Sequence, residues 1–299
     1  MRLPLFNVVK SAFCTCLPKY NINPYLGRCS HGCVYCYAVK FPSFRGPVKP
    51  RLNLKEKVRE AVAGTKVKLP VMLSDCTDPY QPLEEKYEIT RECLKVLAEN
   101  GFPILIVTKS DLVTRDIDLF KRTPTVVSMS ITTLREEISS LIEPNAPSPE
   151  RRFKALEKIA KEKIPTVLRI DPIIPTVNSD LEELENLVSA ASRIGVKQVT
   201  ASTMKPVRGF FKRFKERVDR ETYRRVLEAY SDGLWIAGYK YLPFEKRASL
   251  LRRLRSITLN YGLEFATCRE GIQNLNTNIC DGTAYCRNIL NHYVVHNKE

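Results

Sequence analysis

The sequence has no apolar run long enough to cross a membrane. A transmembrane helix needs about 20 consecutive, mostly apolar residues, and no segment of the 299-residue chain reaches that length. Residues 1–10 carry charge and Pro4 but no long apolar segment, which argues against a secretory leader. We therefore expect a soluble, cytoplasmic protein with no membrane partner.

Acidic side chains are scarce relative to basic ones. The chain has 33 Asp and Glu against 48 Lys and Arg, a net charge of +15. Residues 1–69 hold 13 basic and 2 acidic side chains, residues 205–255 hold 15 and 6, and the segment between them is slightly acidic. If the fold brings both basic blocks to one face, that face suits a polyanion, most commonly nucleic acid. The alternative is a solvated basic surface that favours solubility.

The sequence also gives no sign of export to an oxidising compartment, where disulfides form. Ten cysteines occur in a chain without an evident leader, so reduced thiols used as metal ligands or redox groups are expected. No internal repeat or low-complexity segment is present. With 43% hydrophobic and 27% charged residues, the composition is that of a globular protein.

Short β-branched runs alternate with longer amphipathic segments over the first two thirds of the chain. Strands are expected at residues 20–26, 70–76, 104–110, 125–132, 166–173 and 196–203. Helices are expected at residues 84–100, 111–121, 134–142, 148–163 and 179–194. Near-continuous apolar strands joined by helices indicate an α/β protein with a parallel sheet. Periodicity alone does not distinguish an incomplete barrel from an open, doubly wound sheet.

The alternation ends near Lys205, and a basic and aromatic stretch follows. Helices are expected at residues 220–230 and 244–261, before a cysteine-bearing tail. The candidate nucleic-acid contacts are Arg208, Lys212, Arg213 and Lys215. The neighbouring phenylalanines could stack on bases or form the apolar core of a helix. We divide the chain into an N-terminal segment (1–19), a barrel region (20–205) and a basic helical C-terminal region (206–299).

The most specific motif is a cysteine triplet in the segment CSHGCVYC. Cys29, Cys33 and Cys36 follow a predicted strand and have glycines beside them, so their thiolates can converge on one centre. A zinc site requires four protein ligands, and His31, the only further ligand nearby, is awkwardly placed between two of the cysteines. A cubane cluster held by three thiolates keeps one iron open for an exogenous ligand.

With these residues the chain resembles the radical S-adenosylmethionine (SAM) superfamily. There the triplet holds a [4Fe-4S] cluster with SAM on its unique iron. The segments NPYLGRCSHGCVYCYA and TDPYQPLE are similar, more narrowly, to the branch containing spore photoproduct lyases and proteins called DNA repair photolyases. The resemblance runs over residues 21–205. It implies an incomplete (β/α)6 TIM-like barrel, followed here by the basic, cysteine-containing extension, and a low-potential electron donor as partner.

The resemblance also implies cofactor-binding residues at the ends of the predicted strands. Lys109 matches a lysine that pairs with the SAM carboxylate, and Ser130 matches a serine near the SAM ribose. A carboxylate among residues 75–78 would suit the SAM ammonium group. The cofactor-binding candidates are Tyr35, Asp75, Thr77, Asp78, Lys109, Ser130 and Arg169. Each could instead be an ordinary polar strand end.

Three further residues match catalytic positions of the lyases. Cys76 stands where those enzymes have a hydrogen-donor cysteine, and Tyr35 and Tyr37 match two tyrosines that could relay a radical. The alternatives are that Cys76 is a small buried side chain and Tyr35 packs on adenine. The lyases read C-T-S where this chain reads Cys76-Thr77-Asp78, which puts lesion repair in doubt.

A second cysteine group lies far from the triplet and does not match the lyases. Cys268, Cys280 and Cys286 are candidate ligands of a second iron-sulfur cluster or zinc. Cys14, Cys16 or His292 could supply a fourth ligand. The alternative is that they are buried thiols, as Cys93 is expected to be.

The sequence thus predicts a radical SAM enzyme that acts on nucleic acid, for example in repair of a pyrimidine photoproduct. Two alternatives remain at this point. One keeps the radical chemistry but takes a protein or an anionic small molecule as substrate. The other is a zinc-stabilised nucleic-acid-binding module without catalysis. Nothing in the sequence indicates the oligomeric state.

Overall fold

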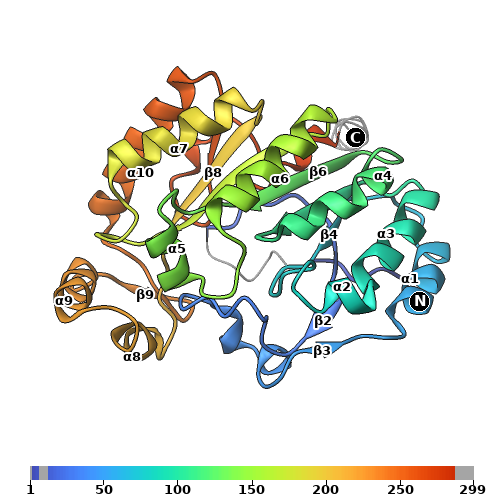
Figure 1. The fold of residues 1–299 in the computed structure, drawn as a ribbon, viewed down its shortest axis with the longest axis horizontal. Coiled ribbons are helices and arrows are strands. Elements are labelled where there is room, and N and C mark those ends of the chain that lie inside the picture. The colour runs from blue at the N-terminus through green and yellow to red at the C-terminus, as the bar shows by residue number, and fades with distance from the viewer. Residues whose placement is uncertain (1, 7–12, 287–299) are drawn as a thin grey trace, which may run out of the picture.

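A seven-stranded parallel sheet organises the chain (Figure 1). The structure is a computed structural model that describes residues 2–6 and 13–286. The sheet order is β1-β4-β5-β6-β7-β8-β11 and every neighbouring pair is parallel. The strands are β1 (Tyr20–Ile22), β4 (Val71–Leu73), β5 (Ile104–Thr108), β6 (Thr125–Ser130), β7 (Thr166–Ile173), β8 (Gln198–Thr203) and β11 (Glu264–Thr267). This architecture confirms the expected α/β fold and is consistent with an incomplete barrel.

Helices cover the outside of the sheet, and two of them form a group at one corner. The helices are α1 (Leu54–Ala63), α2 (Glu84–Tyr87), α3 (Ile89–Glu99), α4 (Ile117–Phe120), α5 (Glu136–Ile142), α6 (Pro149–Lys161), α7 (Leu181–Arg193), α8 (Phe210–Lys215), α9 (Arg220–Ala229) and α10 (Phe244–Asn260). Helices α8 and α9 lie apart from the main body, at the lower left of Figure 1. No helix in the described residues is long and apolar enough to span a membrane.

The helices begin and bury their faces as the sequence pattern predicts. The Asp180 side chain caps α7 by accepting a hydrogen bond from the Glu183 amide at 3.0 Å. The buried residues of this helix follow the spacing of one helical face: Leu184, Leu187, Val188 and Ala191. They pack in the main core with the apolar strands.

The structure also corrects several element predictions. The predicted helix at residues 84–100 is interrupted at Glu88, which has a left-handed backbone (φ 47°). The predicted first strand divides into β1 and β2 (Tyr25–Leu26) on either side of Pro24, and β2 pairs with β3 (Lys49–Pro50) instead of the main sheet. Helix α1 and strand β11 were not predicted. Because β11 pairs with β8, the C-terminal region contributes a strand to the sheet.

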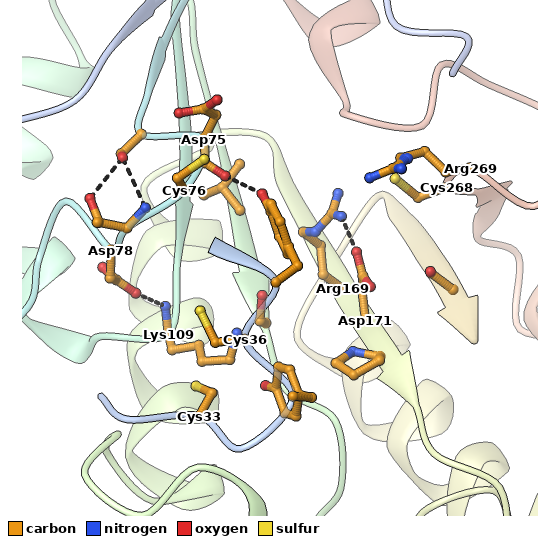
Figure 2. A pocket seen from close by; sticks show the side chains of 18 of the residues that line it. Cys33, Cys36, Asp75, Cys76, Asp78, Lys109, Arg169, Asp171, Cys268 and Arg269 are labelled. Carbon is orange, nitrogen blue, oxygen red and sulfur yellow. Dashed lines mark hydrogen bonds and ion pairs between the residues drawn. The ribbon is translucent and has the colours of Figure 1, made fainter. Parts of the chain in front are cut away.

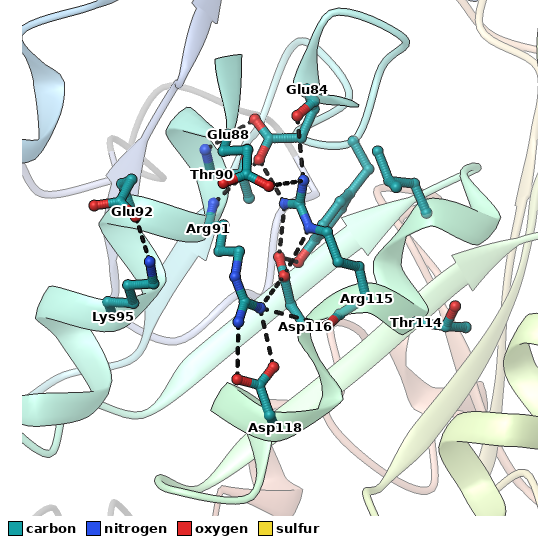
Figure 3. A network of polar contacts seen from close by, with 12 residues as sticks. Glu84, Glu88, Thr90, Arg91, Glu92, Lys95, Thr114, Arg115, Asp116 and Asp118 are labelled. Carbon is teal, nitrogen blue, oxygen red and sulfur yellow. Dashed lines mark hydrogen bonds and ion pairs between the residues drawn. The ribbon is translucent and has the colours of Figure 1, made fainter. Parts of the chain in front are cut away.

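A buried polar network fixes the chain just ahead of the cysteine triplet (Figure 3). The Glu84 carboxylate accepts hydrogen bonds from the Tyr25 hydroxyl and from Arg115, at 2.5 and 2.7 Å. Arg115 and Arg91 both also bind the Asp116 carboxylate. Because Glu84 and Asp116 are fully buried, these charges need their partners to be stable in the core. The network therefore holds β2, from which the triplet loop departs.

Candidate active site

One cavity lies at the carboxyl ends of the parallel strands. Its volume is about 330 Å³. Residues at or just after the ends of β4, β5, β6, β7, β8 and β11 line it, as expected for a parallel α/β sheet. Figure 2 shows Cys33 and Cys36 together with side chains from the ends of β4, β5, β7 and β11. The predicted residues that line the cavity are Cys29, Cys33, Tyr35, Cys36, Tyr37, Asp75, Cys76, Thr77, Asp78, Lys109, Ser130, Arg169, Cys268 and Cys280.

The triplet lies in the loop that follows β2. Gly27 has φ of 75°, and a Cβ atom there would stand 2.0 Å from the Pro47 carbonyl oxygen, so only glycine fits. Gly32, with φ of 66°, turns the chain between Cys29 and Cys33. The conformation of the loop thus depends on the glycines and brings all three thiols to the same cavity.

Burial acts strongly on two of the triplet thiols. It raises the pKa of Cys29 and of Cys33 to about 12. For Cys33 the Lys109 ammonium opposes this effect but does not outweigh it. With only one ammonium group nearby, three partly buried thiols would not be stable as bare thiolates. A metal centre supplies the positive charge that such ligands need.

The two candidate carboxylates of the loop after β4, Asp75 and Asp78, differ in their freedom to bind a ligand. Asp78 accepts hydrogen bonds from the Thr108 hydroxyl at 2.6 Å and the Lys109 amide at 2.7 Å, and lies 3.2 Å from His31 Nε2. Burial alone would raise the pKa of Asp78, but His31 and these donors lower it to about 2. By contrast, Asp75 Oδ1 is buried without a hydrogen-bond partner. Asp75 is therefore the carboxylate with spare capacity for an ammonium group.

A second buried carboxylate, Glu143, was not predicted. It accepts hydrogen bonds from the Tyr35 hydroxyl and from Arg152, and the Lys109 ammonium lies 4.0 Å away. Burial opposes ionisation, but Arg152 and then Lys109 hold the pKa of Glu143 below its ordinary value. Arg152 also donates to the Ser130 carbonyl at 3.2 Å, which fixes the end of β6. Helical periodicity does not predict the Glu143–Arg152 ion pair, because Glu143 lies at the end of α5 and Arg152 lies in α6.

Removing one partner of this ion pair should destabilise the fold strongly. Arg152 and Glu143 are almost fully buried, so Arg152→Ala leaves a buried carboxylate without its hydrogen-bonded counter-ion and with only the Lys109 ammonium, 4.0 Å away. We expect the free energy of unfolding to fall by about 3–5 kcal/mol. Anaerobic urea denaturation measures this. Arg151→Ala is the matched control because Arg151 is exposed and should have little effect; equal midpoints for the two variants would contradict the prediction.

Cys76 and Tyr37 lie together beside the triplet. The Tyr37 hydroxyl donates a hydrogen bond to the Asp75 carbonyl oxygen and contacts the Cys76 sulfur. Burial, and then the Asp75 carboxylate, raise the pKa of Cys76. The side chain is therefore a neutral thiol at physiological pH. Tyr35 is placed differently, because its hydroxyl is bound to Glu143.

The remaining cofactor-binding candidates have protein partners as well as cavity surface. The Thr77 hydroxyl lies 3.0 Å from the Ser74 hydroxyl, and Arg169 forms an ion pair with Asp171. Ser130 is the last residue of β6. All three line the cavity, so each is placed to contact a ligand there.

The second cysteine group has a different membership from the predicted one. Cys16 Sγ lies 3.9 Å from Cys280 Sγ, and Cys14 and Cys268 adjoin the same pair. Cys286 does not join them, because it is enclosed by apolar side chains of β4, β5, β6 and β7 and its nearest polar contact is the Ile104 carbonyl oxygen at 3.8 Å. The prediction of Cys286 as a ligand is therefore wrong. His292 lies outside the described residues.

The two basic blocks meet beside the cavity. Arg28, from the N-terminal block, lines the cavity. It lies close to Arg213 of α8: burial lowers the pKa of Arg213, and the positive charge of Arg28 lowers it further. Arg28 also borders a neighbouring open pocket together with Arg217. These three arginines form no ion pair with a carboxylate of the described chain, and Arg213 Nη2 is buried without a partner. Uncompensated guanidinium groups at a cavity mouth can bind an anion.

The phenylalanines of the basic stretch are core residues. Phe210 and Phe214 are buried and stacked on each other, with ring centroids 5.2 Å apart. Arg208, Lys212 and Lys215 are exposed around them. Base stacking on these two rings is therefore excluded, whereas the basic side chains of α8 stay accessible.

Comparisons with known proteins agree with this arrangement. Residues 23–191 match the Radical SAM superfamily. An uncharacterized protein of Methanocaldococcus jannaschii is 34% identical over 174 residues, covering 57% of this chain and 64% of the relative. A radical SAM Nalpha-GlyT isomerase of a Pseudomonas phage is 22% identical over 254 residues, covering 83% of this chain and 53% of the isomerase. The chain thus spans less than two thirds of the length of either relative.

The fold is similar to that of spore photoproduct lyase. One variant superposes with a TM-score of 0.68 at 13% identity, over 88% of this chain and 80% of the lyase. Another, solved with bound AdoMet and dinucleoside spore photoproduct, gives a TM-score of 0.60 at 14% identity over the same shares. At this identity the similarity establishes the fold and not the reaction.

Proposed function

The chain belongs to the radical SAM superfamily, and we propose that this radical SAM enzyme transfers hydrogen atoms on a nucleic-acid substrate, with a modified or damaged pyrimidine as the reacting group. The observation that carries the nucleic-acid part is the group of arginines without carboxylate partners beside the cavity: Arg28 lines it, Arg217 borders the adjoining pocket, and Arg213 lies near Arg28. The non-catalytic zinc module is set aside, because the family is one of enzymes.

The residues of the cavity fit the cofactors of the family. Cys29, Cys33 and Cys36 would hold a [4Fe-4S] cluster, since three thiols in one loop face one cavity and leave one iron without a protein ligand. The buried, unpartnered Asp75 Oδ1 would accept the SAM ammonium group. The Lys109 ammonium, which also faces the cavity, would bind the SAM carboxylate.

When bound, these cofactors supply a 5′-deoxyadenosyl radical by reductive cleavage of SAM. The chain contributes binding, orientation and exclusion of water. Asp78 cannot take a ligand in the same way, since its oxygens already bind the loop after β4 to the end of β5. Its role is to position Lys109, whose amide it binds.

Cys76 is proposed as the residue that returns a hydrogen atom to the substrate. A neutral thiol can do this: the S–H bond breaks homolytically, a C–H bond forms on the substrate carbon radical, and the sulfur keeps the unpaired electron. The Tyr37 phenol beside that sulfur could then give its own hydrogen atom to the thiyl group. Tyr35, held by Glu143, is proposed to orient the cofactor instead.

Substrate binding should depend on salt and on the unpaired arginines. Phosphate contacts release counterions, so the affinity for a DNA or RNA oligonucleotide should fall steeply as salt rises. Arg213→Ala and Arg217→Ala should each weaken binding for all base sequences and reduce the slope of log K against log salt by about 1. Fluorescence anisotropy with DNA and RNA oligonucleotides measures both quantities and compares the two nucleic acids.

The matched control is Arg224→Ala. This arginine is exposed, as Arg217 is, and lies on the adjacent helix α9, but it is paired with Glu221 at 2.9 Å. It should leave the affinity almost unchanged. Salt-independent binding, or equal effects of all three substitutions, would favour a protein or an anionic small molecule as substrate.

A further inference from the structure

Four cysteines from the two ends of the described chain converge beside the catalytic cavity. Cys14 and Cys16 precede the sheet, whereas Cys268 follows β11 and Cys280 lies twelve residues further on. The thiols form a continuous chain of side-chain contacts, from Cys14 to Cys16, from Cys16 to Cys280 and from Cys280 to Cys268. All four line the same cavity as the triplet.

The segments that carry these thiols are held together by other contacts. Phe13 packs edge-to-face on Tyr241, with ring centroids 5.6 Å apart, and lies against the backbone of Gly271. Lys19 and Asp281 form a buried ion pair at 2.5 Å. The Thr200 hydroxyl donates to the Cys280 carbonyl oxygen at 2.7 Å. The fold therefore brings the segments that carry the four thiols together through contacts other than the thiols themselves.

The charges around the thiols favour an anionic centre. The Lys19 ammonium contacts the Cys16 thiol, and the Arg169 guanidinium contacts the Cys268 thiol. Arg269 lies next to Cys268 in the chain, and its Nε atom is buried without a hydrogen-bond partner. One divalent ion with four thiolates has a net charge of −2. Lys19 and Arg169 are also paired with Asp281 and Asp171. Arg269, which forms no ion pair with a carboxylate of the described residues, is therefore the cation with charge to spare for such a centre.

The spacing indicates a single ion. Zinc–sulfur bonds of about 2.3 Å place the thiolates of a tetrahedral site about 3.8 Å apart, and Cys16 Sγ and Cys280 Sγ are 3.9 Å apart. Among the described residues, no group of three His, Cys, Asp or Glu side chains is arranged around a common point as metal ligands would be. The same is true of the triplet cysteines. In the metal-free chain the thiols contact one another instead. Rotation about their Cα–Cβ bonds is the change that binding requires.

We propose that the chain has a second metal site, separate from the triplet: a closed tetrathiolate site for one zinc ion, formed by Cys14, Cys16, Cys268 and Cys280. With four protein ligands it has no open position and takes no part in the radical chemistry. It ties residues 13–19 to the segment after β11 and so closes one side of the cavity.

Metal analysis of the complete chain tests this proposal. Anaerobically purified and reconstituted protein should contain one zinc ion per chain in addition to the four iron atoms of the triplet cluster. Cys14→Ser and Cys280→Ser should each lose the zinc and keep the iron, and Cys33→Ala should lose the iron and keep the zinc. Cys286→Ala is the matched control, because this buried thiol lies away from the cluster and should leave both metals in place. Cobalt(II) in place of zinc should give the intense visible absorption of a tetrahedral thiolate complex, which Cys14→Ser removes.

Three results would overturn the assignment. Eight iron atoms per chain without zinc would show that the four cysteines hold a second iron-sulfur cluster instead of a single zinc ion. Iron at the triplet alone, with no zinc and no cobalt spectrum, would eliminate the site. Two thiols fewer than expected on titration of the unfolded, metal-free protein would show a disulfide, which the short distance between Cys16 and Cys280 also permits. Cys14 is less buried than Cys280, so its variant keeps the test valid if Cys280→Ser fails to fold.

Discussion

Cys33→Ala is expected to abolish both iron binding and cleavage of SAM. Cys33 is the central cysteine of the triplet, and its loss leaves two thiolates for a cluster that needs three. The glycine-dependent loop itself carries only these three cysteines. The expected result is iron content near zero and no 5′-deoxyadenosine after addition of dithionite and SAM.

The measurements are iron analysis, the visible spectrum and chromatography of the nucleoside product, all under anaerobic conditions. Cys93→Ala is the control, since Cys93 is buried inside α3 and lies outside the cavity. It should bind iron and cleave SAM like the unmodified chain. A full cluster in Cys33→Ala, or no 5′-deoxyadenosine from the unmodified chain with a full cluster, would refute the assignment of the triplet.

Cys76→Ala is expected to separate SAM cleavage from completion of the reaction. The thiol is not needed to hold the cluster, so 5′-deoxyadenosine should still form. The substrate radical then has no S–H bond to react with, and formation of the normal product should fall to background. An ultraviolet-irradiated, thymine-rich oligonucleotide is the first substrate to use.

Deuterium provides the decisive measurement for this role. A thiol exchanges its hydrogen with solvent, so the unmodified enzyme in deuterium oxide should place one deuterium in the product. Burial and the Asp75 carboxylate raise the pKa of Cys76, so the S–H form, and with it product formation, should persist as the pH rises through the ordinary thiol range. Cys93→Ala should behave like the unmodified chain. Normal turnover of Cys76→Ala with unchanged deuterium content would remove the proposed role.

Local patterns in the sequence predicted much of the architecture. The mostly apolar runs at residues 104–110, 125–132 and 166–173 all became buried parallel strands, because a strand covered on both faces is apolar over most of its length. Strand β11 escaped prediction, since its four residues EFAT are too short for a periodic signal. Its identity depends on pairing with β8, a contact between distant parts of the chain.

The same distinction applies to the candidate site. The triplet could be recognised because its three ligands lie within eight residues and their spacing restricts the chemistry. The difference between Asp75 and Asp78 could not, because it depends on which donors the neighbouring strand supplies. Glu143 and Arg152 were missed for the same reason, since two charged residues on successive helices are usually solvated.

The sequence by itself determined the α/β class, the cysteine triplet and the two basic blocks, because these features reside in composition or in short, local spacing. Only the tertiary structure decided that Cys14 and Cys16 meet Cys268 and Cys280, that Cys286 does not, and that Arg28 lies near Arg213. Contacts between the two ends of a chain depend on how the whole sheet closes. No local pattern of residues encodes that geometry.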